Sequence, residues 1–160
     1  MTQQVSPYLR NSYRLADVLA AIQVMGAYTW ASRRVSAWAD KLGDPLSSGP
    51  WAEIFVEHPE FFRVSGEWAS LRWRHGYDRN FSPTLSRELS SGEIEKLQKH
   101  EKDDLTRKAL DSDQIEALMK TAIELHNRAI AHSQEKRWLT PILFALLGTI
   151  VGAVLQAALK

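Results

Sequence analysis

The feature that most constrains the fold is an uncharged run at the C-terminal end. The chain carries 20 Lys and Arg and 19 Asp and Glu, yet residues 138–159 contain none of them. At about 1.5 Å of rise per residue a helix of this length spans roughly 33 Å, close to the ~30 Å hydrocarbon core of a bilayer. We therefore predict a transmembrane helix over 138–159. A buried C-terminal helix in a soluble oligomer is the alternative, but this run is apolar on all sides rather than along one stripe.

The residues that flank this run predict its orientation. Lys136 and Arg137 precede it, Trp138 stands at the expected interfacial level, and only Lys160 follows it. Positive charge concentrates on the cytoplasmic side of a membrane helix. We expect a single-pass membrane protein, with the lipid bilayer as a partner and residues 1–137 in the cytoplasm.

The same run contains a pattern of small residues. It forms two adjacent rows on a helix, Gly148, Gly152 and Gln156 in one and Ala145, Thr149 and Ala153 in the other. Small residues let helices approach closely in lipid, and a Gln amide can bond its twin across an interface. We expect a homo-oligomer that associates through this face. The alternative is a chance pattern, because Gly is common in spanning helices.

The first apolar stretch of the chain predicts a core helix. Over residues 15–31 the apolar positions recur with i, i+3, i+4, i+7 spacing, which is typical of one buried helix face. Asp17 and Gln23 interrupt the stretch. It is therefore predicted as a core helix rather than as a signal peptide or a second span.

Two further helices are predicted after it. Thr29 or Ser32 can cap a short second helix that Gly43 closes. Pro50 can occupy the first turn of a third helix, and Pro59 ends that helix. The three helices account for most of the apolar residues in the N-terminal third of the chain.

Two short runs that follow the third helix predict a β-hairpin. EFFRV and WASLRWR flank turn residues 65–67, and in the second run Ala69, Leu71 and Trp73 alternate with polar residues. Three helices followed by this hairpin, with the stretch HPEFFRVSGEWASLRWR, resemble a winged-helix domain over residues 13–75. The resemblance implies DNA binding, with the third helix in the major groove and the hairpin, or wing, on the backbone.

The remaining segment predicts a linker and a helical stalk. The composition becomes polar over 76–92, and Ser90 with Glu93 forms a capping box that begins a helix. Apolar residues then recur with 3,4 spacing over 93–137, either as a stalk coiled coil or as the seam of an antiparallel helical pair. The predicted fold class is mainly α, with a small winged-helix-like domain, a helical stalk and a C-terminal transmembrane helix.

The charges of the predicted domain define a candidate binding surface. The third helix offers carboxylates and no Lys or Arg, and these would repel a DNA groove. Positive side chains lie on the hairpin and just after it. The candidate surface comprises Glu53, Glu57, Arg63, Trp68, Arg72, Arg74 and Arg79. Its arginines can hold RNA or a single strand with Trp68 stacking on a base, contact a protein, or only keep the hairpin soluble by pairing with Glu67 and Asp78.

Patterns for catalysis or metal binding are missing from the sequence. The chain has no Cys, which excludes disulfides and thiolate chemistry. Its five His lack the i, i+4 spacing of a helical metal site, and the chain has neither a Gly-rich phosphate loop nor G-x-S-x-G. We expect a non-enzymatic protein that uses no metal or cofactor.

Three classes of function remain. The first is a membrane-anchored cytoplasmic binding module, an adaptor or scaffold for an unidentified protein, that self-associates through its C-terminal helix. The second is a membrane-tethered nucleic-acid binder with the hairpin arginines on phosphates. The third is a membrane-disrupting oligomeric effector, supported only by the weak polarity of Gln156 and Thr149. A net charge of +1 gives no global attraction to nucleic acid, so the first class is preferred.

Overall fold

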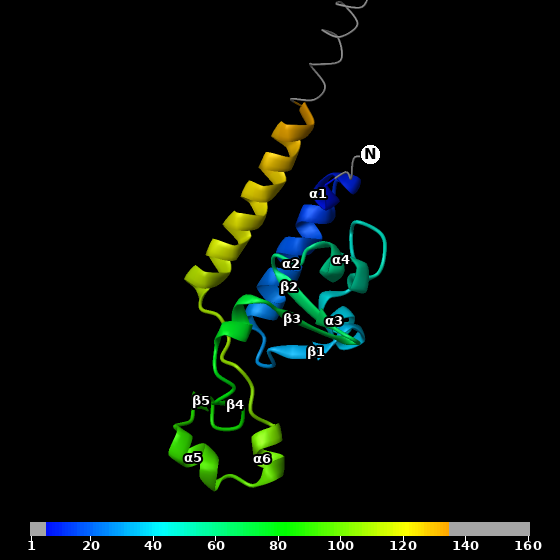
Figure 1. Ribbon diagram of the computed structural model, residues 1–160. Helices are drawn as coiled ribbons and strands as arrows, with labels where there is room; N and C mark the ends of the chain where they lie inside the picture. Colours follow the sequence, from blue (N-terminus) through cyan, green and yellow to red (C-terminus); the bar gives the residue numbers. More distant parts are fainter. Residues whose placement is uncertain (1–5, 135–160) are drawn as a thin grey trace, which may run out of the picture.

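A small helical domain built on a three-stranded sheet forms the first part of the molecule (Figure 1). The computed structural model describes residues 6–134. The helices of this domain are α1 (Pro7–Arg10), α2 (Arg14–Ala27), α3 (Val35–Leu42) and α4 (Trp51–Glu57). The strands are β1 (Ser32–Arg34), β2 (Phe62–Ser65) and β3 (Trp68–Leu71). The predicted first helix, third helix and hairpin are therefore present.

The sheet contains one strand that the sequence did not predict. Its order is β1-β3-β2 with antiparallel pairing throughout, so β1 is an edge strand beside the hairpin. Residues 32–34 pair with β3, and the second helix therefore begins at Val35 rather than directly after Thr29 or Ser32. The strand is only three residues long and its sequence, SRR, is polar, so no alternating apolar pattern marked it.

The core lies between α2 and the inner face of the sheet. Val18, Ile22 and Met25 of α2 are fully buried, and Phe62 and Leu71 meet them from the sheet. Burying each such side chain stabilises the fold by about 1.5–3 kcal/mol before opposing terms. The apolar spacing that predicted the helix is thus the face that it buries.

After the sheet the chain makes an excursion and returns. The 3-10 helix η1 (Trp73–Gly76) leads to β4 (Phe81–Ser82), β5 (Arg87–Glu88), α5 (Ser91–Lys96) and α6 (Lys99–Asp103). These four elements lie together at the lower end of the molecule (Figure 1). The expected Ser90–Glu93 capping box is present at the start of α5. The return segment is fixed by a bridge between Phe81 and Thr106 and by a bond from the Leu110 amide to the Gly26 carbonyl.

A long helix over residues 112–134 runs beside α2, antiparallel to it (Figure 1). Leu118 and Ala122 are buried and join the core. A Cβ atom added at Gly26 would lie 2.9 Å from the Ile115 Cγ1, which shows how closely the two helices approach. Of the two arrangements expected for this segment, the structure has the antiparallel pair, with α2 as the partner.

The membrane part of the predicted fold class is corrected. Within residues 6–134 no helix is both long enough and apolar enough to cross a membrane. The predicted span over 138–159 and its flanking Lys136, Arg137 and Trp138 lie outside the described residues. So do the predicted oligomerisation residues Gly148, Gly152, Gln156, Ala145, Thr149 and Ala153.

The transmembrane helix and the single-pass membrane location are therefore not supported, and what the structure supports is a mainly helical chain with a small sheet. The two longest described helices each bury only one stripe against protein. In the helix over 112–134 charged residues occupy much of the remaining surface, and in α2 the exposed positions are Ala16, Ala20, Gln23 and Ala27.

Candidate binding site

The sheet has an outer face that no helix of the core covers, and it carries an exposed tryptophan. In β3, Ala69 and Leu71 are buried toward the core, whereas Trp68 is 49% exposed. Residues paired across strands share a face of the sheet. Trp68 pairs with Arg34 of β1, and Ser70 pairs with Arg63 of β2. Arg34, Arg63 and Trp68 therefore lie on this outer face.

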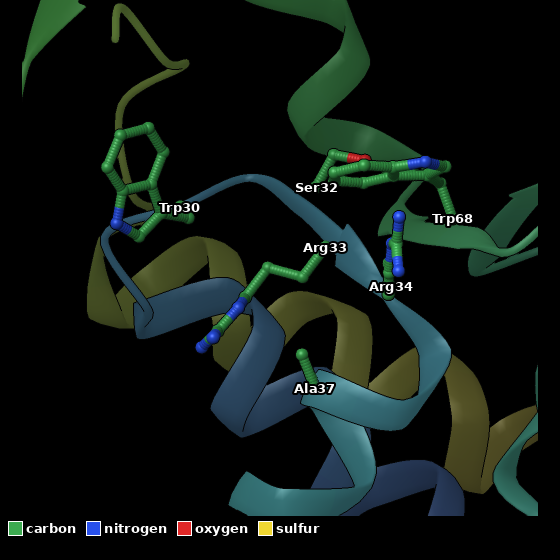
Figure 2. A pocket seen from close by; sticks show the side chains of 6 residues that line it. All are labelled: Trp30, Ser32, Arg33, Arg34, Ala37 and Trp68. Atoms are coloured by element: carbon green, nitrogen blue, oxygen red, sulfur yellow. The ribbon is translucent and has the colours of Figure 1, made fainter.

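Trp68 and Trp30 border a hollow of about 350 Å³ at β1 (Figure 2). Figure 2 shows the two indoles at either side of the strand, with the Arg34 guanidinium below the Trp68 ring. Arg33 turns away from Trp68, because its Nη1 donates to the Tyr28 hydroxyl at 2.8 Å. The hollow thus combines two aromatic walls with the guanidinium of Arg34, which lies 3.7 Å from the exposed Glu67 carboxylate.

A second hollow of about 420 Å³ continues from the first. The two share Trp30, Ser32 and Trp68, and the second extends to His75, Arg79 and Arg107. We call the continuous outer surface formed by Trp30, Arg34, Arg63, Trp68, His75 and Arg107 the Trp68 surface. It brings together residues from β1, the hairpin, η1 and the return segment.

Positive charge converges on this surface at His75. The His75 Nε2 lies 2.9 Å from the Ser70 hydroxyl, and its Nδ1 lies 3.4 Å from the Arg63 Nη1. Burial lowers the pKa of His75 from its ordinary value, and the nearby charges of Arg107, Arg63 and Arg72 lower it further. Each of these cations disfavours the imidazolium form, and their effect on the pKa adds to the larger effect of burial.

Asp103 is the one acidic residue that lines the second hollow, and no ion pair joins it to the arginines there. Among the residues that the structure describes, no Asp or Glu oxygen lies within 4.0 Å of Arg63, Arg72, Arg79 or Arg107. The expected pairing of these arginines with Glu67 and Asp78 is therefore absent there. Glu67 instead approaches Arg34 at 3.7 Å, with both side chains exposed, and exposed pairs of this kind are worth only about 0–1 kcal/mol.

Arg74 is not a surface residue, and it is removed from the candidate surface. Its side chain is fully buried and donates to four backbone carbonyls, those of Met25, Tyr28, Thr29 and Arg107, at 2.6–3.1 Å. Burial, followed by the charge of Arg107, lowers its pKa to about 10. Arg74 therefore ties η1 to the end of α2 and cannot reach a partner.

Two other predicted arginines are exposed but held in place by backbone carbonyls. Arg79 donates to the carbonyls of Leu105 and Asp103, at 2.6 and 2.5 Å. The Arg72 Nε donates to the Pro59 carbonyl at 2.7 Å. These bonds orient the two guanidinium groups and involve no carboxylate side chain.

The predicted acidic residues belong to a different place. Glu57 of α4 pairs with Arg10 and lies 3.4 Å from the buried Arg14, whose distance to Glu53 is 3.9 Å. Neither carboxylate lines the hollows beside Trp68. The structure thus separates Glu53 and Glu57 from the hairpin residues with which the sequence grouped them.

The sequence did not place Trp30, Arg34, His75 and Arg107 at the site. Arg34 could have been found only by recognising β1, which the polar sequence of that strand concealed. Arg107 arrives from the return segment, thirty-five or more positions from the hairpin, and no local pattern indicates that contact. Within residues 6–134 no three His, Asp or Glu side chains converge as a metal site would require.

Comparison with known proteins assigns neither a family nor a function to the chain. No protein-family model, curated protein or solved structure matches the chain. The function is therefore argued from the residues and their geometry.

Proposed function

We propose that this chain is a non-enzymatic binding module that holds an anionic partner on the Trp68 surface. The observation that carries the proposal is geometric: Arg63 lies 3.4 Å from His75, Arg107 lines the same hollow as His75, and no Asp or Glu oxygen of the described residues lies within 4.0 Å of either arginine. Like charges held together cost free energy, and an anionic partner removes that cost. An exposed tryptophan flanked by arginine is also a typical composition for binding hot spots.

The proposal includes a winged-helix-like architecture for residues 13–75. It is supported by the chain order α2, β1, α3, α4, β2, β3 and by the sheet order β1-β3-β2. The resemblance would place α4 in a DNA groove, but the exposed positions of α4 are Ala52, Glu53 and Val56. An acidic and apolar helix is unsuited to phosphate-lined grooves. We therefore assign binding to the outer sheet face instead of to α4.

The adaptor proposal and the nucleic-acid proposal both fit this charge. An acidic segment of a protein would supply carboxylates, and a nucleic acid would supply phosphates. From the sequence alone a protein partner was preferred to a nucleic acid, because the sequence showed only a few arginines on the hairpin. The added Arg34 and Arg107, together with the second indole, favour a partner with both repeated anions and planar groups.

The proposal is tested by the binding of labelled heparin, a generic polyanion, to the full-length chain. We expect binding that weakens steeply from about 50 to about 200 mM salt. Arg63→Glu should weaken it on the order of tenfold, since unit charges 4 Å apart interact by about 1 kcal/mol even in water and a reversal doubles the change. Arg63 is suited to this test because its side chain is exposed.

Lys120→Glu provides the matched control. It reverses one exposed charge on the helix over 112–134, away from the Trp68 surface, and should leave heparin binding unchanged. Equal loss in the two variants, or no binding by the unmodified chain, would refute the assignment of a specific anionic site.

A further inference from the structure

We infer that the partner of the Trp68 surface is single-stranded nucleic acid, with an unpaired base stacked on Trp68 and phosphates on the surrounding arginines. This inference rests on the proposed function and specifies its ligand. It starts from an exposed indole, Trp68, and a half-buried one, Trp30, on the same face as several arginines, of which Arg34 lies 3.7 Å from the exposed Glu67. Single-strand binding sites combine these two elements, a cationic groove for the backbone and aromatic rings for the bases.

The indole itself argues for a planar ligand. Trp68 leaves 49% of its surface exposed on a sheet whose inner face is closely packed, and its ring borders both hollows. Hollows of about 350 and 420 Å³ lie in the range, ~300–1,000 Å³, that is usual for small-molecule sites. A base on Trp68 would lie beside hollows that Arg34 and His75 also line.

The positions of the cations argue for a chain of anions rather than one. Arg34 lines the first hollow, Arg107 lines the second, and Arg63 of β2 lies 3.4 Å from His75 of η1. The shared indoles make these parts of one surface. A backbone with a phosphate at every nucleotide can meet several of these cations at once, whereas a single small anion meets only one of them.

Two competing ligands fit less well. Duplex DNA keeps its bases paired and stacked, so it cannot place a base on Trp68, and the acidic α4 offers it no groove helix. An acidic protein segment satisfies the arginines but supplies no planar group for the indoles. The core of a protein interface is depleted of charged residues, whereas the hollow beside Trp68 is lined by Arg33 and Arg34 as well as by Trp30, Ser32 and Ala37.

The test compares oligothymidylate of about twelve nucleotides with an abasic strand of the same length and with poly-glutamate, by fluorescence anisotropy on the full-length chain. Base stacking on one aromatic ring should make oligothymidylate bind roughly five- to a hundredfold more tightly than the abasic strand. Trp68→Ala should remove this difference, and Trp68→Phe should retain most of it. Trp73→Ala is the matched control, because Trp73 is 42% exposed and lines neither hollow.

The outcomes separate this inference from the function on which it rests. Equal, salt-sensitive binding of the abasic strand and oligothymidylate would overturn the single-strand inference and leave the anionic site standing. Tighter binding of poly-glutamate would overturn it in favour of an acidic protein, and tighter binding of a duplex would overturn it in favour of double-stranded DNA. Loss of heparin and oligonucleotide binding together would overturn both. Circular dichroism and thermal unfolding of Trp68→Ala and Trp68→Phe establish that a loss of affinity is not a loss of fold.

Discussion

At the scale of single residues, Arg74 and Arg63 differ in burial, and the sequence does not show which of them is buried. Both lie in or next to the hairpin, yet Arg74 is fully buried and Arg63 is exposed. A buried guanidinium normally needs a carboxylate. Arg74 instead uses carbonyls at the C-terminal end of α2, those of Met25 and Tyr28, where the helix leaves acceptors unsatisfied and carries partial negative charge. All four of its carbonyl partners are more than thirty positions away, so no local sequence pattern predicts these contacts.

His75 gives a residue-level prediction about pH. Its pKa in the free protein is lowered from 6.5 by burial and by Arg107, Arg63 and Arg72. A bound polyanion would offset those charges and raise the pKa. Binding then takes up a proton, so oligonucleotide affinity should increase as the pH falls from about 8 to about 5.5. Titration of the imidazole by NMR, with and without oligothymidylate, measures the shift directly.

His75→Gln is the control for this effect, because it keeps a polar partner for Ser70 without a titrating group. The variant should bind with an affinity that changes little over the same pH range. A pH dependence that survives in His75→Gln, or an imidazole pKa that stays fixed on binding, would contradict the linkage.

At the scale of elements, the predictions succeeded where one apolar face decides the structure and failed where distant chain segments meet. The apolar spacing of α2 was visible because that helix buries one stripe. The alternation predicted for the second hairpin run was right for Ala69 and Leu71 but wrong for Trp73, which follows β3 in η1 and is 42% exposed. The edge strand β1 was missed, since its residues are held by pairing with β3 rather than by burial. The same failure hid half of the candidate site, which depends on Arg34 and on the returning Arg107.

The contact between α2 and the helix over 112–134 carries a prediction about Gly26. A Cβ at this position meets Ile115 Cγ1 at 2.9 Å, which forces the helices apart. Gly26→Ala should therefore lower the free energy of unfolding by about 1 kcal/mol, because overpacking of about 1–3 kcal/mol outweighs the helix propensity gained. Urea unfolding of the full-length chain measures the change.

Ile115→Ala removes the atom that clashes and completes a double-mutant cycle. In that background Gly26→Ala should become stabilising, since only the propensity gain of about 0.8–1 kcal/mol remains. A stabilising Gly26→Ala in the original chain would mean that the two helices do not approach as closely as the structure indicates.

At the scale of the whole molecule, the helix over 112–134 is part of the core and the excursion before it is not. Leu118 and Ala122 are buried with α2, so this helix completes the domain rather than projecting from it. The sequence correctly indicated an apolar stripe on this helix, but it does not show which surface such a stripe packs against. The excursion has short elements, and neither α5 nor α6 buries a residue.

Native-state hydrogen exchange should therefore divide the molecule into two parts. Elements without buried residues open locally at a low free-energy cost, whereas elements that share a core open only with it. We expect the amides of α5 and α6 to exchange by local openings that need little denaturant, even though both helices begin with capping boxes. Amides around Leu118 and Ala122 should instead exchange together with those of α2, at the free energy of global unfolding. If the helix over 112–134 exchanges as early as α5, its contact with α2 contributes little to stability, and the domain ends before it.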